Sequence, residues 1–317
     1  MKNLKDFDVA GKRILVRCDF NVPCDASGAI LDDTKISEAL PTLQYLLTQK
    51  AKIIIITHLG DGSQSLDSVK ARLFELLGQS VDVLENIRSH QEEIENNLEF
   101  AKKLANMGDI YINEAFDVCH RAHASVVGIP QFLPHGAGFA LQKEVEVLSG
   151  IMQKPARPMV AIIGGAKAKT KALFVQPFCA FADVVIINGL IKQELIDKKI
   201  PLEYPEKVFG PKENLGGLDL TPEDINRIVE KIKPAKTIFW NGPFGKFEDE
   251  EYKKGTLAIA KAIIESGAFS VVGGGETIEF LKKEGMLDKF SHVSTAGGAL
   301  MEFLSGQELP GLVALDS

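Results

Sequence analysis

Seven short apolar runs recur along this chain and limit the folds open to it. They span residues 13–20, 52–57, 109–116, 159–165, 183–189, 237–242 and 269–275. Each run is too short for the core of a helix and too continuously apolar for a strand with one wet face. The runs therefore predict parallel strands that are buried on both faces of a sheet.

Helix-like segments lie between these runs, at 36–49, 98–107, 140–149, 252–266 and 277–284. This alternation is typical of α/β layers. A chain of 317 residues predicts two domains at roughly 100 to 200 residues each. We place a hinge at 150–158, where a glycine, two prolines and basic residues follow a helix-like segment, and we expect 196–224 to be irregular.

Charge and cysteine usage exclude several classes of protein. A formal charge of -7 disfavours an extended basic surface for nucleic acid. The four cysteines form no CxxC pair, so neither a zinc knuckle nor a disulfide framework is indicated. No apolar stretch approaches the roughly 20 residues that span a bilayer. We therefore expect a cytoplasmic protein with reduced thiols, no membrane contact and no nucleic-acid partner.

Four glycine-rich turns follow apolar strands or open helices in the second half, at 162–171, 240–248, 271–280 and 294–303. Glycine lets the backbone approach a phosphate, whose charge free N–H groups and a helix dipole favour. Lys167 and Lys171 share the first turn at i, i+4 spacing, where two ammonium groups repel unless an anion lies between them. Each turn alone is equally explained by a tight connection, and Lys169 by a solvated surface. The Walker and GxGxxG patterns are absent from the sequence.

Polar residues in the first half cluster after the predicted strands. They are Asp19, Asn21, His58, Arg88, His120, Arg121 and His123. Residues beyond the carboxyl ends of parallel strands converge on one edge of a sheet, so we expect an anion site there. Each histidine singly is also compatible with a structural role. Metal binding by His120 and His123 is disfavoured because no partner ligand has suitable spacing.

Several of these motifs resemble the phosphoglycerate kinase family, in that family's order. They are KRILVRCDFNVP at 12–23, ALPTLQYLL at 39–47, THLG at 57–60, LENIR at 84–88, INEAFDVCHRAHAS at 112–125, AIIGGAKAKTK at 161–171, WNGPFGKFE at 240–248, VVGGGET at 271–277 and SHVSTAGGALMEFLSGQELPG at 291–311. The resemblance implies two Rossmann-like lobes with parallel sheets and a connecting helix near 140–153. It places a 3-phosphoglycerate lobe at 1–145 with a returning tail at 304–317, and a nucleotide lobe at 146–303.

The resemblance also implies roles for individual residues, with ATP or ADP and Mg²⁺ as cofactors and a monomeric enzyme. The substrate-binding residues would be Asp19, Asn21, His58, Arg88 and Arg121, and the catalytic positions Lys35, Lys171, Gly275 and Gly297. Nucleotide would meet Gly164, Gly165, Lys167, Lys171, Asn241, Glu248, Gly273, Gly274, Gly275, Glu276 and Thr277, and Glu276 would also be linked to the metal. Because the acceptor carboxylate is ionised at neutral pH, the reaction needs positioning and cationic charge rather than a general base.

Four positions depart from the family pattern. Lys35 replaces a catalytic arginine and so lacks its planar fork, and Asp61 reverses the charge of another arginine. Glu276 is one methylene longer than the family's aspartate, and Ala296 replaces a glycine. The chain is also shorter than the family norm, with segments expected to be missing between residues 83 and 84 and after 189.

Two functions follow from this pattern. The first is a minimal, working phosphoglycerate kinase with low activity. The second is a kinase-like protein that binds ligand without turnover, in a regulatory or partner-binding role. Lys35, Asp61, Ala296 and the shortened nucleotide lobe favour this second function. A plain scaffold without a ligand ranks last, because it leaves the pair of Lys167 and Lys171 unexplained.

Overall fold

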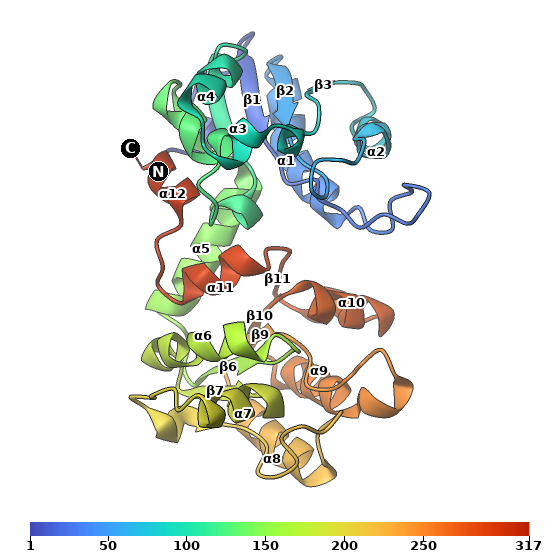
Figure 1. Ribbon diagram of the computed structural model, residues 1–317, viewed down its shortest axis with the longest axis vertical. Coiled ribbons are helices and arrows are strands. Elements are labelled where there is room, and N and C mark those ends of the chain that lie inside the picture. The colour runs from blue at the N-terminus through green and yellow to red at the C-terminus, as the bar shows by residue number, and fades with distance from the viewer. Residues whose placement is uncertain (317) are drawn as a thin grey trace. The chain divides into compact units, whose positions relative to one another are not determined.

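The computed structural model describes residues 1–316 and divides them into two compact units (Figure 1). Unit 1 comprises Met1–Glu146 together with the described residues from Glu308 onward, and unit 2 comprises Val147–Gln307. The division at 146/147 falls inside helix α5 (Phe139–Gln153), which begins in unit 1 and ends in unit 2. The segment after 307 contains helix α12 (Pro310–Leu315), whose Gly311 N–H donates to the carbonyl of Cys119, 2.8 Å away.

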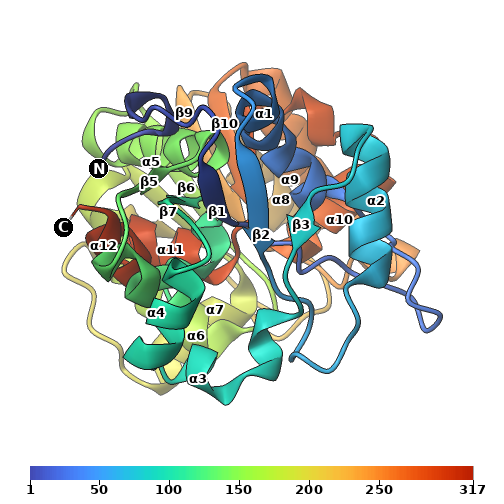
Figure 2. The same cartoon turned by 90° about the horizontal axis from the view of Figure 1, so that it is seen from above.

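Unit 1 is built on a five-stranded parallel sheet in the order β3-β2-β1-β4-β5. The strands are β1 (Arg13–Arg17), β2 (Lys52–Ile56), β3 (Asp82–Val83), β4 (Ile110–Asn113) and β5 (His135–Ala137). Its other helices are α1 (Thr34–Thr48), α2 (Asp67–Leu77), α3 (Gln91–Ile94) and α4 (Leu98–Ala105). Figure 2 shows β1 beside β2, in agreement with their parallel pairing from Arg13 to Arg17.

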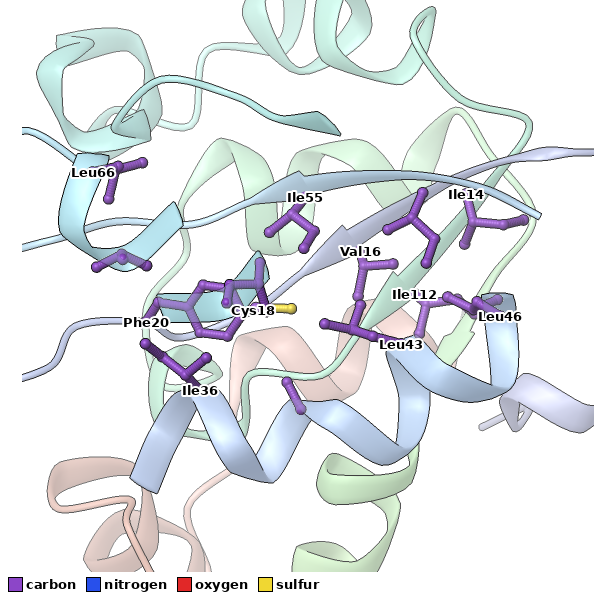
Figure 3. Close-up of a cluster of buried hydrophobic side chains, with 14 of the residues drawn as sticks. Ile14, Val16, Cys18, Phe20, Ile36, Leu43, Leu46, Ile55, Leu66 and Ile112 are labelled. Atoms are coloured by element: carbon purple, nitrogen blue, oxygen red, sulfur yellow. The ribbon is translucent and has the colours of Figure 1, made fainter. Parts of the chain in front are cut away.

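The side chains of β1 alternate between the main core of unit 1 and the opposite face of the sheet. Ile14 and Val16 point into the cluster that Ile36, Leu43 and Leu46 of α1 complete (Figure 3). Successive side chains of a strand point to opposite faces, so Leu15 and Arg17 point away from α1. The strand therefore delivers a fully buried arginine to the face opposite its main core.

Unit 2 is built on a six-stranded parallel sheet in the order β11-β10-β9-β6-β7-β8. The strands are β6 (Met159–Ile163), β7 (Val184–Ile187), β8 (Val208–Phe209), β9 (Thr237–Asn241), β10 (Phe269–Gly273) and β11 (His292–Ser294). The helices are α6 (Ala168–Phe181), α7 (Gly189–Asp197), α8 (Pro222–Ile232), α9 (Lys254–Ser266), α10 (Gly275–Lys283) and α11 (Gly298–Leu304).

Helices cover both faces of this sheet. Ile238 and Trp240 share one cluster with apolar residues of α8, α9 and α10, whereas Phe239, on the opposite face, packs against Phe178 of α6 with ring centroids 5.3 Å apart. All five residues of β9 are buried, as a strand covered on both faces requires. No helix in residues 1–316 is long and apolar enough to cross a membrane.

Each of the seven apolar runs contains a strand, so the predicted α/β class is confirmed. The strands that the runs did not predict, β3, β5, β8 and β11, have only two or three residues each. Strands this short carry too few residues for an apolar pattern. The segment 196–224, predicted to be irregular, holds the end of α7, a 3₁₀ turn, β8 and the start of α8.

Candidate functional site

The first candidate site lies at the carboxyl ends of β1, β2 and β4 in unit 1. Arg17, the last residue of β1, donates from Nε to Oγ of Ser125 at 2.9 Å and from Nη1 to the carbonyl of Cys18. Ser125 is held in turn by Glu93, whose two carboxylate oxygens accept from the Ser125 N–H at 2.8 Å and its hydroxyl at 2.6 Å. This fully buried network anchors the turn that carries His120, Arg121 and His123.

The loop after β2 is tied to the other strand ends by hydrogen bonds. Asn21 Oδ1 accepts from the Gly60 N–H at 2.8 Å, and Nη1 of Arg88 donates to the Gly60 carbonyl at 2.9 Å. A Cβ on Gly62 would lie 2.5 Å from the Arg88 backbone, so this approach requires glycine. The structure therefore brings Asn21 and Arg88, predicted from separate motifs, to the same loop.

His58 is buried as a neutral ring. Its Nδ1 lies 3.2 Å from Nη2 of Arg17, a donor that leaves Nδ1 as the acceptor. Burial and the charge of Arg17 hold the pKa of His58 far below its usual range, although Asp19 opposes the shift. At neutral pH the remaining ring nitrogen therefore carries the proton and can donate it in a hydrogen bond.

Cationic groups gather around Arg88 and repel one another. Burial, Arg121 and Arg17 lower the pKa of Arg88 to about 10, and burial with Arg121 and Arg88 lowers the pKa of His123 to about 4. Arg121 also donates from Nε to Nε2 of His120 at 3.2 Å. Like charges this close are relieved by an anion between them, so this cluster fits an anionic ligand.

Lys35 and Asp61 contact groups that the sequence did not associate with them. Nζ of Lys35, on α1, lies 2.6 Å from Oδ2 of Asp19 and 2.6 Å from Oδ2 of Asp117. Asp61 is exposed, and its carboxylate accepts from the N–H and hydroxyl of Ser63 at 2.9 and 2.7 Å. The Asp61 carboxylate, which replaces a positive charge of the family pattern, is thus hydrogen-bonded within its own turn.

The second candidate site lies at the carboxyl ends of β6, β9, β10 and β11 in unit 2. Nζ of Lys171 donates to the Gly164 carbonyl at 2.6 Å and to Oδ1 of Asn241 at 2.8 Å. Burial lowers the pKa of Lys171 to about 8; Glu276 opposes this shift, and Lys167 adds to it. Lys167 and Lys169 are exposed, so Lys171 alone of the three turns toward the strand ends.

Glycines allow these loops to lie against one another. A Cβ on Gly242 would lie 2.1 Å from the Gly164 carbonyl oxygen and 2.4 Å from Nζ of Lys171. A Cβ on Gly165 would lie 3.1 Å from Nζ of Lys171 and 3.3 Å from Oε2 of Glu276. The ammonium and the carboxylate therefore flank the same stretch of backbone.

The remaining predicted residues of unit 2 lie in different surroundings. Thr277 is fully buried, and its hydroxyl accepts from the Gly242 N–H at 2.8 Å. Gly274 precedes α10 with a φ of 93° and faces the Asn241 side chain, while Gly273 meets Leu300. Gly275 and Gly297 have no neighbour within 4 Å of an added Cβ, so both border open space.

Two further predicted positions are less closely tied to this site. Glu248 is exposed, and the hydrogen bonds of Lys171 go to Gly164 and Asn241 instead. Ala296, which replaces a glycine of the family motif, is buried, so its methyl group packs into the unit.

Sequence reasoning missed Arg17, Glu93, Asp117 and Ser125. A signal existed for Arg17, because a charge inside a run predicted to be buried on both faces requires a partner. No local sequence pattern predicts a role for Glu93, Asp117 or Ser125, because their partners are remote in sequence. Among residues 1–316, no group of three or more His, Cys, Asp or Glu is placed to hold a metal ion.

Comparison with known proteins places most of the chain in one family. The sequence model of the family described as phosphoglycerate kinase matches residues 4–83, 67–201 and 199–307. The phosphoglycerate kinase of Pelotomaculum thermopropionicum is 37% identical over 388 aligned positions, covering 99% of this chain and 98% of that protein. That of Borreliella burgdorferi strain ZS7 is 38% identical over 392 positions, covering 100% of each.

Solved structures agree with these sequences. The structure of phosphoglycerate kinase from Coxiella burnetii has a TM-score of 0.87 at 31% identity, covering 99% of this chain and 98% of that one. The enzyme from Pyrococcus horikoshii also has a TM-score of 0.87, at 29% identity, covering 100% and 98%. Both alignments with relatives are longer than the 317 residues of this chain, so internal segments of the relatives have no counterpart in it. The three segments matched by the family model overlap at residues 67–83 and 199–201.

Proposed function

This chain belongs to the phosphoglycerate kinase family, and we propose that it transfers a phosphoryl group between ATP and the carboxylate of 3-phosphoglycerate, as a step of glycolysis. The reaction is reversible: the reverse direction returns the group from 1,3-bisphosphoglycerate to ADP. The acceptor carboxylate is already ionised at neutral pH, so no residue has to remove a proton. The protein must instead position two anions and stabilise the charge on the group in transfer.

The observation that carries this proposal is the cationic cluster of unit 1. Burial lowers the pKa of His58 and of His123, and the charges of Arg17 and Arg88 lower both further, as expected where cationic groups gather to bind an anion. In our proposal Arg88 and Arg121 bind the phosphate of 3-phosphoglycerate. Asn21 and the donor nitrogen of His58 bind its polar groups, while Asp19 orients Lys35.

Unit 2 is the proposed nucleotide unit. Lys171 offers an ammonium at the junction of β6 and β9, and the backbone at Gly275 and Gly297 borders open space in which phosphate oxygens can approach N–H groups. The proposed nucleotide contacts are the predicted residues Gly164, Gly165, Lys167, Lys171, Asn241, Glu248, Gly273, Gly274, Gly275, Glu276 and Thr277. Glu248 is exposed, and it is the weakest member of this set.

Glu276 is the proposed protein link to Mg²⁺. Its carboxylate is exposed beside Lys171, and a single carboxylate with substrate phosphates is the donor set that Mg²⁺ commonly uses. The residues present therefore fit this ion. Mg²⁺ bound with the nucleotide supplies positive charge that neutralises phosphate oxygens.

A second function, ligand binding without turnover, is favoured by two observations. The Lys35 ammonium is already engaged by two carboxylates, and Ala296 is buried where the family motif has a glycine. Both would reduce the stabilisation of a phosphoryl group in transfer. The two functions differ in turnover and agree on binding.

A coupled assay of 1,3-bisphosphoglycerate formation from ATP and 3-phosphoglycerate tests the proposal. We expect measurable turnover that EDTA abolishes and Mg²⁺ restores. Arg88→Gln should raise the KM for 3-phosphoglycerate about 10-fold, the scale of one lost charge-assisted contact, with little change in the KM for ATP. Arg72→Gln, which removes a half-buried arginine of the same unit that pairs with Asp33 and Glu75, is the control. Binding of both ligands without turnover would favour the second function, and no binding of either would contradict both.

A further inference from the structure

Lys35 lies between two carboxylates that come from different strand ends. Asp19 follows β1 and Asp117 lies in the turn after β4, and each places Oδ2 2.6 Å from the Lys35 Nζ. The side chain of Lys35 is 23% exposed, so it is only partly buried. The Lys35 ammonium donates a hydrogen bond to Asp19, and Asp117 forms a second ion pair with the same ammonium.

The charges in this group do not balance. With both carboxylates ionised, one positive charge faces two negative charges, and the group carries a net charge of -1. Burial and the neighbouring Asp19 raise the pKa of Asp117 to about 6, although Lys35 opposes the shift. Lys35 and Asp19 keep each other charged: burial works against both, yet the pKa of Lys35 is raised and that of Asp19 lowered. At neutral pH the group is therefore mostly anionic.

An anionic substrate must compete with this arrangement. The substrate needs the Lys35 charge, but that charge is already paired with two carboxylates in a group whose net charge is negative. We propose that the carboxylate of Asp117 competes with 3-phosphoglycerate for the ammonium of Lys35 and thereby lowers the affinity for that substrate. This inference rests on the proposed function, since it assumes that the ligand of unit 1 is 3-phosphoglycerate.

Protonation of Asp117 would relieve the competition. The charged groups that face Asp117 are Lys35 from α1 and Asp19 from the segment after β1, and the Cys119 thiol lies in its own turn. Of these groups, only Asp117 changes its charge between pH 5 and 8. Affinity for the substrate should therefore weaken as pH rises through the pKa of Asp117. In a variant without this carboxylate, the affinity should not show this pH dependence.

The test compares the Kd for 3-phosphoglycerate of the wild type and of Asp117→Asn by calorimetry. At pH 7.5 we expect the variant to bind about 10-fold more tightly, the scale of removing one like charge near a partly exposed site. At pH 5 the ratio of the two Kd values should fall to about 1, because the wild-type carboxyl is then protonated. Both proteins bind the same ligand, so protonation of the ligand changes the two Kd values equally and cancels in their ratio.

Two controls separate this mechanism from a general effect of charge or folding. Asp82→Asn removes an exposed aspartate of unit 1 and should change the Kd less than about 2-fold. In the Lys35→Gln background, Asp117 loses the ammonium that keeps it ionised. Adding Asp117→Asn should then leave the Kd for 3-phosphoglycerate unchanged at pH 7.5. Asp117→Ser serves as a second variant if the asparagine disturbs folding, and thermal melting checks each protein.

The outcomes distinguish this inference from the proposed function. Turnover and binding in the wild type, with no tightening in Asp117→Asn or Asp117→Ser, would overturn the inference alone. A tightening that is equal at pH 5 and 7.5, or that persists in the Lys35→Gln background, would also overturn it. No binding of 3-phosphoglycerate by any variant would overturn both. Binding that appears only in the Asp117 variants would support the inference and favour the function without turnover.

Discussion

Nζ of Lys171 and Oδ1 of Asn241 lie 2.8 Å apart, and this hydrogen bond joins helix α6 to the end of strand β9. The same ammonium donates to the Gly164 carbonyl, so it links two neighbouring strand ends. Its position is thereby held by the sheet, as preorganised stabilisation of a developing charge requires. Lys169, two residues earlier, is exposed and has no such constraint.

Removal of the Lys171 charge should therefore reduce catalysis specifically. Lys171→Met should lower kcat by about 10² to 10³, the scale for one preorganised electrostatic contact. Lys169→Met, the matched control, should change kcat less than about 2-fold. Steady-state kinetics with saturating substrates measures both, and thermal melting reports folding. Equal losses at the two positions would contradict the role assigned to Lys171.

The lowered pKa of Lys171 predicts an alkaline limit to activity. Burial brings this pKa to about 8, so kcat/KM for ATP should fall above that pH as the ammonium loses its proton. Asn241→Asp would place a negative charge beside Nζ and raise the pKa, which should move the limit to higher pH. The pH profile of kcat/KM checks this, and an unchanged limit in Asn241→Asp would assign it to another group.

Glu114 should make the stability of the protein depend on pH. Burial raises the pKa of Glu114 to about 8, although Oε1 accepts from the Ala140 N–H at 3.0 Å. The folded pKa is above the unfolded value of about 4.3, so this stabilisation is complete below pH 4.3 and is lost as pH rises through 8. Between these limits it falls by up to about 1.4 kcal/mol per pH unit.

Glu114→Gln tests this dependence, because its amide mimics the protonated acid and does not titrate. The free energy of unfolding of the wild type, relative to that of the variant, should decrease from pH 5 to pH 8. Urea unfolding at several pH values measures the difference. A constant difference would mean that Glu114 titrates alike in the folded and unfolded chain.

Substitution of Gly275 tests whether the accessible backbone at the start of α10 binds a ligand. A Cβ at Gly275 meets nothing within 4 Å, so Gly275→Ala should leave the melting temperature unchanged or slightly raised. If nucleotide phosphates approach this backbone, the same methyl group should raise the KM for ATP about 10-fold. Gly150→Ala, equally open but in α5, is the control and should leave the KM unchanged. An unchanged KM in Gly275→Ala would remove this residue from the proposed site.

Local patterns in the sequence determined the α/β class and much of the two candidate sites. A continuous apolar run is a property of adjacent residues, so β1, β2, β4, β6, β7, β9 and β10 could be predicted from single segments. Polar residues and glycines that follow such runs must gather at the carboxyl edge of a parallel sheet. Asn21 and Arg88 could be assigned to one site for this reason, and both contact Gly60 in the structure.

Only the tertiary structure decided which partners those residues have. Ser125 lies 108 positions after Arg17, and Asp117 is far along the chain from Lys35, so neither pairing leaves a local pattern. Whether Lys35 presents its charge to a ligand depends on the carboxylates that the folded strands bring to it. Burial, which sets the pKa values of Glu114 and Lys171, is likewise a property of the whole packed unit, because it depends on every segment that excludes water from the group.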